Sequence, residues 1–323
     1  MTVSVRKIDL WGWTGIELAG ERVSLVITPE IGGRIISLAL DGEETLFSLP
    51  ELRGKRFPIQ DARDVRARKK ELGWLHYGGY KTWLAPQARW TEGLPFLDLN
   101  SGSYEYEIAE SHANPIVRLS SPVCRETGIQ FTRTLSLDDT GRVVVEQGMT
   151  NTSSKEVEWG LWDVTQLCGP GQAVLPTNRD SRFRGGVKAY STEGHSPDVM
   201  DRYVTRKQNL ALVSCREIEP FKYGTDSTEG WILGLLDKGG DRSLAYLKSF
   251  KPEPGGIYPH EAVVEVYDSG TLPYFELEVH SPLKRLDPDT TYCYTETWIL
   301  NWLPKKPSAE EIREWVGLYL LTA

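Results

Sequence analysis

The chain alternates between short runs in which every second residue is apolar and short stretches rich in turn-forming residues. A period of two residues is typical of β-strands that bury one face. Turn signals such as Asp41-Gly42 and Lys238-Gly239-Gly240 separate these runs. The pattern predicts strands at residues 22–28, 34–40, 104–108, 128–137, 142–150, 157–167, 211–216, 231–236, 243–248, 262–267, 274–282 and 292–300. Such a succession of strands predicts a large antiparallel sandwich.

The pattern changes to a helical period only near the end of the chain. Ser308 and Glu311 form a capping box after a proline, and the apolar residues that follow lie on one stripe of a helix. We predict a short C-terminal helix at about residues 308–321, packed on an edge of the sandwich. No linker or repeat divides the chain, so we expect a single all-β domain whose sandwich covers about residues 3–302.

One predicted strand carries an unusual polar face. In the run from Tyr274 to Pro282, Glu276, Glu278 and His280 share one face, and the residues between them are apolar. Neighbours on one face of a strand are only ~6.6 Å apart at their Cα atoms. Three ionisable groups this close require water, partner charges or a ligand. The strand is therefore the first candidate for a functional site.

Composition narrows the choice of partner. The chain has 323 residues, a net charge of -8, 11 Trp, 14 Tyr and only 3 Met. An acidic protein repels phosphates and anionic lipid, so we expect neither nucleic acid nor membrane as a partner. The chain shows neither a signal peptide nor a membrane span, which predicts a soluble, cytoplasmic protein.

Two further stretches receive structural interpretations. The segment from Arg53 to Glu71 is rich in Lys and Arg, and we interpret it as a solvated surface loop or exposed helix rather than a phosphate-binding patch. The four cysteines show no metal-binding spacing, and we interpret them as buried thiols.

The stretch from Gly73 to Trp90 follows neither a helical nor a strand period. It combines glycines and aromatic residues with the hydrogen-bonding residues His76, Lys81 and Gln87. Trp and Tyr rings stack on the apolar faces of sugars, while charged and amide groups bind hydroxyls. This composition predicts a ligand-binding loop, although a loop that closes one end of a sandwich with aromatics is an equal alternative.

Several short motifs together resemble the galactose mutarotase-like (aldose 1-epimerase) superfamily, in particular its uncharacterised bacterial members. The motifs are Ile31-Gly32-Gly33-Arg34-Ile35, Gly78-Gly79-x-Lys81-x-Trp83-x-x-Pro86-Gln87-x-x-Trp90, Asn151-Thr152-Ser153, Phe275-Glu276-Leu277-Glu278 with Ser281-Pro282, and Pro288-Asp289-Thr290 with Tyr294-x-Glu296-x-Trp298. The resemblance covers about residues 20–302. It implies a β-supersandwich whose concave sheet binds a sugar.

The resemblance also implies catalytic roles. In mutarotases a glutamate on a late strand takes the proton of the anomeric hydroxyl, and Glu278 matches that glutamate. A histidine on the central strand protonates the ring oxygen, but residues 159–167 contain none. Asp163 or His280 is the candidate acid in its place. Asp163 has two structural alternatives, capping a turn or pairing with a lysine.

The predicted site is a sugar site without metal or cofactor. Its substrate-binding candidates are Arg34, His76, Lys81, Trp83, Gln87, Trp162, Lys222, Lys248, Tyr258 and Glu276. Hydrolysis is disfavoured, because Glu276 and Glu278 lie on one strand and would approach a glycosidic bond from the same side. The expected partner is a small-molecule carbohydrate, and the expected activity is that of an aldose 1-epimerase. A non-catalytic sugar-binding protein and a purely structural network of paired charges are the alternatives.

Overall fold

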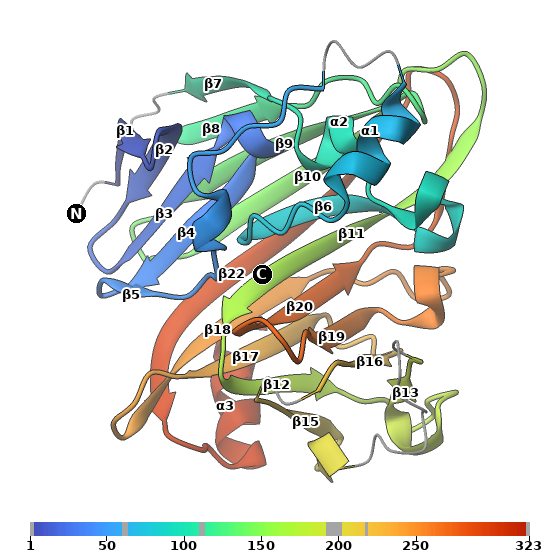
Figure 1. Ribbon diagram of the computed structural model, residues 1–323. Coiled ribbons are helices and arrows are strands. Elements are labelled where there is room, and N and C mark those ends of the chain that lie inside the picture. Colours follow the sequence, from blue (N-terminus) through green and yellow to red (C-terminus); the bar gives the residue numbers. More distant parts are fainter. Residues whose placement is uncertain (1–2, 60–63, 110–113, 192–201, 217–218, 321–323) are drawn as a thin grey trace.

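Two antiparallel β-sheets face each other and form a sandwich (Figure 1). The computed structural model describes residues 3–59, 64–109, 114–191, 202–216 and 219–320. The first sheet runs, in spatial order, through β1 (Ser4–Leu10), β2 (Trp13–Ala19), β3 (Val23–Thr28), β4 (Arg34–Leu40), β6 (Tyr80–Ala85), β11 (Val157–Cys168), β20 (Tyr274–His280), β19 (Val264–Asp268), β16 (Phe221–Thr225) and β13 (Lys188–Ala189). Two short strands join it at the side, β5 (Glu43–Glu44) beside β4 and β21 (Lys284–Leu286) beside β11.

The second sheet lies behind the first in Figure 1. Its order is β14 (Val204–Lys207), β15 (Leu210–Cys215), β12 (Gly171–Pro176), β17 (Trp231–Asp237), β18 (Arg242–Phe250), β22 (Thr291–Pro304), β10 (Val143–Asn151), β9 (Ile129–Leu137), β8 (Ile116–Ser120) and β7 (Glu105–Ala109). The all-β sandwich expected from the alternating pattern is confirmed, because each predicted strand coincides with an observed one to within a few residues.

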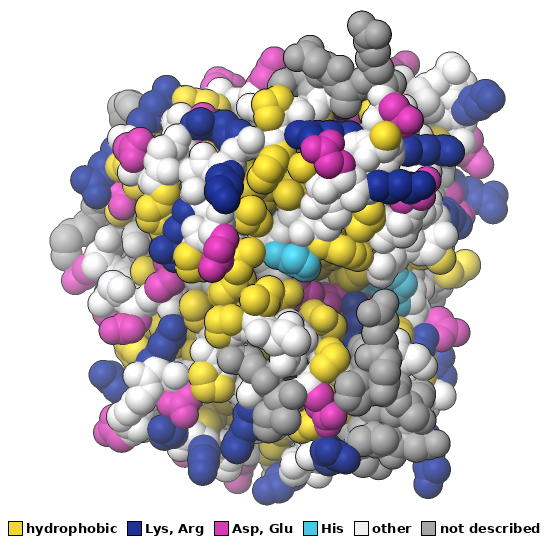
Figure 2. Space-filling model, viewed as in Figure 1, with side chains coloured by type: hydrophobic (Ala, Val, Ile, Leu, Met, Phe, Trp, Pro, Cys, Tyr) yellow, Lys and Arg dark blue, Asp and Glu magenta, His cyan; other side chains and the backbone are white. Residues whose placement is uncertain are grey.

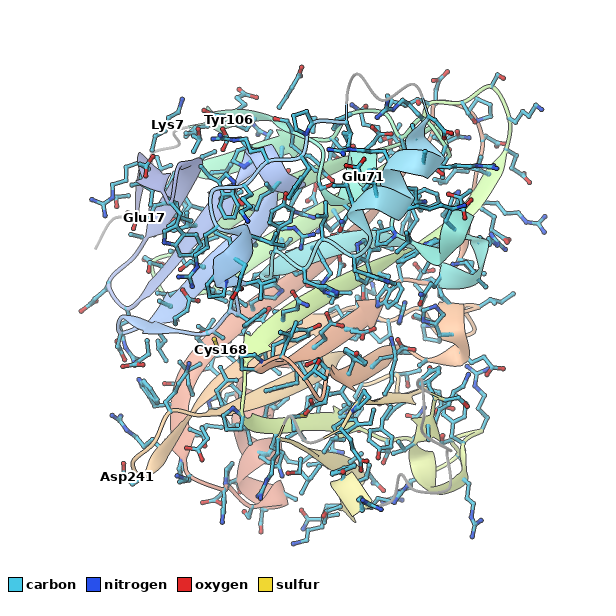
Figure 3. The ribbon with its side chains drawn as sticks, viewed as in Figure 1. Lys7, Glu17, Glu71, Tyr106, Cys168 and Asp241 are labelled. Atoms are coloured by element: carbon cyan, nitrogen blue, oxygen red, sulfur yellow. The ribbon has the colours of Figure 1, made fainter. Side chains whose placement is uncertain are left out.

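The inner faces of the two sheets share one continuous hydrophobic core. Leu161 and Leu277 from the first sheet and Tyr246 from the second belong to it, and each side chain is fully buried. At one end of the sandwich the outer strands β1 and β7 meet, where the Lys7 ammonium lies 5.0 Å from the centroid of the Tyr106 ring (Figure 3). Apolar burial on this scale is the main force that holds the sheets together.

The C-terminal helix is confirmed as α3 (Ala309–Leu320). Its capping box forms, since the Ser308 amide donates to Glu311 at 2.7 Å and the Glu311 amide donates to the Ser308 hydroxyl at 3.2 Å. The predicted position on an edge of the sandwich is wrong, because the apolar stripe, including Ile312 and Trp315, packs on the outer face of the second sheet. None of the helices in the described part of the chain is long and apolar enough to cross a membrane.

The basic stretch contains α1 (Val65–Leu72), and the prediction of an exposed segment is wrong at one position. Lys69 is fully buried, and its ammonium donates to Thr91 at 2.7 Å and lies 4.7 Å from the Phe96 ring centroid. Residues 60–63 of this stretch lie outside the described residues. Lys69 therefore anchors α1 to the body of the protein.

Two other sequence interpretations need correction. The aperiodic stretch contains a strand, β6, near the middle of the first sheet, and a short helix, α2 (Leu97–Asn100), follows it. Both faces of β6 are buried, which removes the alternation that marks a half-exposed strand. None of the four cysteines forms a disulfide. Cys124 and Cys215 are buried as expected, whereas Cys168 is only half-buried and Cys293 is exposed.

Candidate functional site

The outer face of β20 carries the three ionisable side chains that the alternation predicts. Glu276, Glu278 and His280 point away from the second sheet, and the apolar residues between them join the core. All three are buried, because β11 and β19 flank the strand and other side chains cover the face. Figure 2, which views this side of the molecule, shows one histidine side chain among apolar ones near its middle and a second one further to the right. Buried charges require partners, and those partners define what this face can do.

Glu278 is held by two donors from neighbouring strands. The indole Nε1 of Trp162 donates to its Oε2 at 2.6 Å, and the Lys222 ammonium lies 2.7 Å from the same oxygen. Trp162 belongs to β11 and Lys222 to β16, so strands on both sides of β20 fix one carboxylate. Burial raises the pKa of Glu278 well above its usual range, and the nearby Glu265 raises it further against the opposing effect of Lys222.

Glu265 is the cross-strand neighbour of Glu278 and shares its lysine. The two residues lie directly opposite each other in the β19–β20 ladder, and Lys222 Nζ is 2.7 Å from a carboxylate oxygen of each. Burial works against ionisation, but Lys222 and His280 together hold the pKa of Glu265 well below its usual range. One ammonium therefore serves an ionised Glu265 and a Glu278 that retains its proton more readily.

Two imidazoles complete this corner of the site. His280 Nε2 lies 3.0 Å from Glu265 Oε2, and His260 Nδ1 lies 3.4 Å from the same oxygen. Both rings pack on Trp162, with centroid distances of 5.5 and 4.8 Å. Burial lowers the pKa of His280 to about 4, despite the attraction of Glu265, so this imidazole is neutral at pH 7. The backbone N–H of Gln87 donates to His260 Nε2 at 3.4 Å, which places the backbone of the predicted residue Gln87 beside this corner.

The same corner contains the donor set of a possible metal centre. One ligand atom each from His260, Glu265 and His280 lies within 4.8 Å of the others. However, the Lys222 ammonium is only 2.7 Å from Glu265 and already supplies the positive charge there. A divalent cation would have to displace it, so these residues fit an ion-pair cluster better than a metal centre.

A second ion pair lies one pleat further along β20. Gln166 Nε2 donates to Glu276 Oε1 at 2.8 Å, and the Lys81 ammonium lies 3.3 Å from the same oxygen. The ammonium also sits 4.4 Å from the centroid of the Trp83 ring, a cation–π arrangement. Burial lowers the pKa of Lys81 to about 8, against the opposing attraction of Glu276.

Arg34 borders this second pair and bonds to backbone and amide groups. Its guanidinium donates to the carbonyl of Gly78 at 3.0 Å and to Asn100 Oδ1 at 2.9 Å. The indole of Trp83 donates to the same Asn100 oxygen at 2.8 Å, so one amide fixes both side chains. His76 is half-buried nearby; burial and the adjacent Lys81 lower the pKa of its imidazole.

Two predicted site residues are wrong, because their side chains enter the core. Asp163 is the cross-strand neighbour of Val279, so it faces the second sheet rather than Glu278, and it accepts a hydrogen bond from Thr82 at 2.6 Å. Lys248 belongs to β18 of the second sheet and pairs with Glu296 at 3.0 Å between the sheets. Neither residue can reach a ligand on the outer face.

Tyr258 is a third predicted residue that the structure places elsewhere. Its ring belongs to the main hydrophobic core, and its hydroxyl accepts a hydrogen bond from the Glu253 amide at 2.8 Å. It therefore supports the loop before β19 rather than the outer face. The structure does bring the other predicted residues to that face: Arg34, His76, Lys81, Trp83, Gln87, Trp162, Lys222, Glu276, Glu278 and His280.

Sequence reasoning missed Glu265. A single carboxylate between Val264 and Val266, in a strand just before β20, was the available signal. Its meaning depends on the strand register, which places it opposite Glu278. His260 is a second such residue, since only the fold brings its ring within 4.9 Å of the His280 ring, measured between centroids.

In the described part of the chain, the ion-paired side chains of the outer face expose little surface. Two surface cavities of about 530 and 170 Å³ lie elsewhere: Thr177, Arg206 and their neighbours line the larger, and Glu30, Arg56 and theirs line the smaller. The side chain of Glu278 is only 1% exposed, and that of Lys222 is 16% exposed. A ligand that reaches Glu278 must therefore move the groups that cover it.

Comparisons with known proteins identify the fold. Neither protein-family models nor curated proteins match this sequence. A galactose mutarotase-like protein from Clostridium acetobutylicum is 12% identical with a TM-score of 0.55, and the alignment covers 94% of this chain and 99% of that one. A similar protein from Lactobacillus casei is 10% identical with a TM-score of 0.52, covering 89% and 100%. A protein from Klebsiella pneumoniae, provisionally described as an aldose 1-epimerase, is 12% identical with a TM-score of 0.58, covering 90% and 79%.

Proposed function

Because this chain has the galactose mutarotase-like fold, we propose that it binds a small carbohydrate on the outer face of its first sheet and interconverts the anomers of an aldose. The observation that carries the proposal is the pairing of Glu278 with Trp162 and Lys222, beside two imidazoles. Fold likeness alone does not define an activity, so the argument rests on this constellation.

Glu278 is the proposed base. Anomer exchange requires a group that takes the proton of the anomeric hydroxyl and another that protonates the ring oxygen, after which the ring opens and recloses on either face. A raised pKa makes an ionised carboxylate a stronger base and moves its titration toward neutral pH. Lys222 would stabilise the negative charge that develops on the sugar oxygen, since its pKa is raised by the two carboxylates despite burial.

The acid is one of the two histidines beside Glu265. His280 is the candidate named from the sequence, and it lies on the same face as Glu278, unlike Asp163. His260 is the other, because its side chain is 17% exposed whereas that of His280 is fully buried. Because His280 is neutral at pH 7, His260 is the better candidate, and its Nδ1 lies 3.4 Å from Glu265 Oε2.

The ion pairing of the carboxylates on this face favours a second candidate function. Glu265 and Glu278 share Lys222 and Glu276 pairs with Lys81, so the described carboxylates of this face are all engaged without a ligand. A sugar-binding protein that has lost catalysis needs only hydrogen-bonding groups and aromatic surface, which this face also offers.

The test is anomer exchange measured by NMR saturation transfer on neutral, acidic and phosphorylated aldoses. Glu278→Gln should abolish the exchange and keep the fold, because glutamine can still accept the hydrogen bond from Trp162. Glu17→Gln is the control, since Glu17 pairs with Arg6 on the first strands. Exchange that persists unchanged in Glu278→Gln would contradict the assignment. Sugar binding without exchange in both the wild type and the variant would establish the second candidate.

A further inference from the structure

Trp74 presents an exposed aromatic surface at the edge of the candidate site. It follows Gly73, the residue that ends α1, and precedes β6. Its side chain is 38% exposed, whereas most tryptophans of the described chain are largely buried. An exposed indole beside a candidate sugar site offers a flat apolar surface on which a ligand can stack.

The Trp74 ring is fixed although it is exposed. It stacks on His76 with a centroid distance of 6.2 Å and an angle of 16°. Trp83 and Trp90 contact it at 5.7 and 6.0 Å in tilted or edge-on geometries. A ligand that stacks on this ring would therefore lose little affinity to the ordering of the side chain.

A line of aromatic contacts connects Trp74 to the proposed base. Trp83 packs edge-on against Trp162 at 5.0 Å, and Trp162 donates its indole hydrogen bond to Glu278. The polar groups beside this line are those of the second ion pair, since Lys81 lies over Trp83 and influences the pKa of His76. Three indoles in contact thus lead from the exterior to Glu278, with Lys81 beside the middle one.

We propose that Trp74, supported by His76, is the stacking platform that receives the apolar face of a pyranose ring at the entrance of the site. This inference rests on the proposed function, because it assumes that the outer face is the sugar site. The C–H groups on one face of a pyranose match an indole in size and polarity. Trp74 acts on binding and specificity rather than on the reacting atoms.

A stacking platform at Trp74 predicts how substitutions of this residue change the affinity for a sugar. Trp74→Ala should weaken sugar binding roughly 3- to 10-fold, the effect expected for one aromatic stacking contact. Trp74→Phe should recover part of that loss. If anomer exchange occurs, the Ala variant should raise KM and leave kcat near the wild-type value, because Trp74 lies away from Glu278.

Trp11 provides a matched control. It is 41% exposed, close to the value for Trp74, but it lies between β1 and β2 and stacks on Arg53 with the guanidinium carbon 4.2 Å from the ring centroid. Trp11→Ala therefore removes an equally exposed indole that has no place in the line to Glu278.

The experiment is saturation-transfer difference NMR of the wild type, Trp74→Ala, Trp74→Phe and Trp11→Ala with D-galactose, D-glucose and D-glucuronate. The acyclic polyol galactitol is added because it offers hydroxyls without a ring face. The proposal expects a pyranose that binds the wild type and Trp11→Ala equally, binds Trp74→Ala more weakly, and is preferred to galactitol. Equal binding to wild type and Trp74→Ala overturns the platform while the proposed sugar site stands. A wild type that binds none of the sugars and exchanges no anomers overturns both.

Discussion

Replacing Lys222 with methionine should destabilise the protein more than any surface lysine substitution. Its ammonium lies 2.7 Å from Glu265 and 2.7 Å from Glu278, and its side chain is only 16% exposed. Removing one partner of a buried ion pair typically costs 3–5 kcal/mol, because the remaining charge loses its compensation. Burial raises the pKa of Glu278 and Lys222 lowers that of Glu265, so the loss of the ammonium should cost Glu265 more than Glu278. We therefore expect a loss of about 3 kcal/mol, the lower end of that range.

The loss should depend on pH with a defined sign. In the wild type Lys222 and His280 keep the pKa of Glu265 low, and in Lys222→Met that pKa should rise above its value in the unfolded chain. When folding raises the pKa of a carboxyl group, the folded protein loses stability as the pH rises from the unfolded-state pKa to the folded-state pKa. The difference in unfolding free energy between wild type and variant should accordingly be larger at pH 8 than at pH 5.

Urea unfolding followed by circular dichroism at both pH values measures this difference. Lys284→Met is the matched control, because Lys284 pairs with Glu253 at a more exposed position, where ion pairs contribute at most about 1 kcal/mol. A loss in Lys222→Met no larger than in the control, or one that shrinks as pH rises, would refute the electrostatic reasoning.

Three other predictions concern the residues around the site. The imidazole of His280 should stay neutral down to pH 5, because burial lowers its pKa to about 4, and side-chain 15N chemical shifts would show an earlier protonation if this is wrong. Burial raises the pKa of Glu296 to about 7, so the free energy of unfolding should decrease as the pH rises from about 4 to 7. In Glu296→Gln, urea unfolding at several pH values should show a smaller decrease. Gly78→Ala should destabilise the fold by more than about 1 kcal/mol, since φ is +100° there and a Cβ would lie 2.1 Å from the Phe47 carbonyl; an unchanged melting temperature would contradict this.

The alternation of apolar and polar residues was sufficient to predict the sandwich and the polar face of β20. It was not sufficient to decide which face of β11 looks outward. Asp163 and Trp162 alternate correctly, but a strand buried on both sides gives no polarity contrast, and the polar residue points inward to Thr82. Only the pairing register with β20 settles the question, and a sequence does not specify register between strands more than a hundred residues apart.

The same limit explains why Glu265 was missed and β6 was not recognised. Glu265 acquires its role from standing opposite Glu278, a relation between two strands rather than a motif within one. Residues of β6 are buried on both faces and include Lys81, whose charge is hidden in an ion pair with Glu276. Helical signals are local, which is why the capping box at Ser308 was predicted correctly.

The lysine shared by two carboxylates affects how readily each of them binds a proton. While Lys222 bridges Glu265 and Glu278, Glu278 keeps its proton to a higher pH than an exposed carboxyl group does, and Glu265 loses its proton at a lower pH. A neutral sugar that displaced Lys222 from either carboxylate would change the affinity of that carboxylate for protons. Sugar binding would then take up or release protons to the buffer, so the affinity for a ligand that does not itself titrate would still vary with pH.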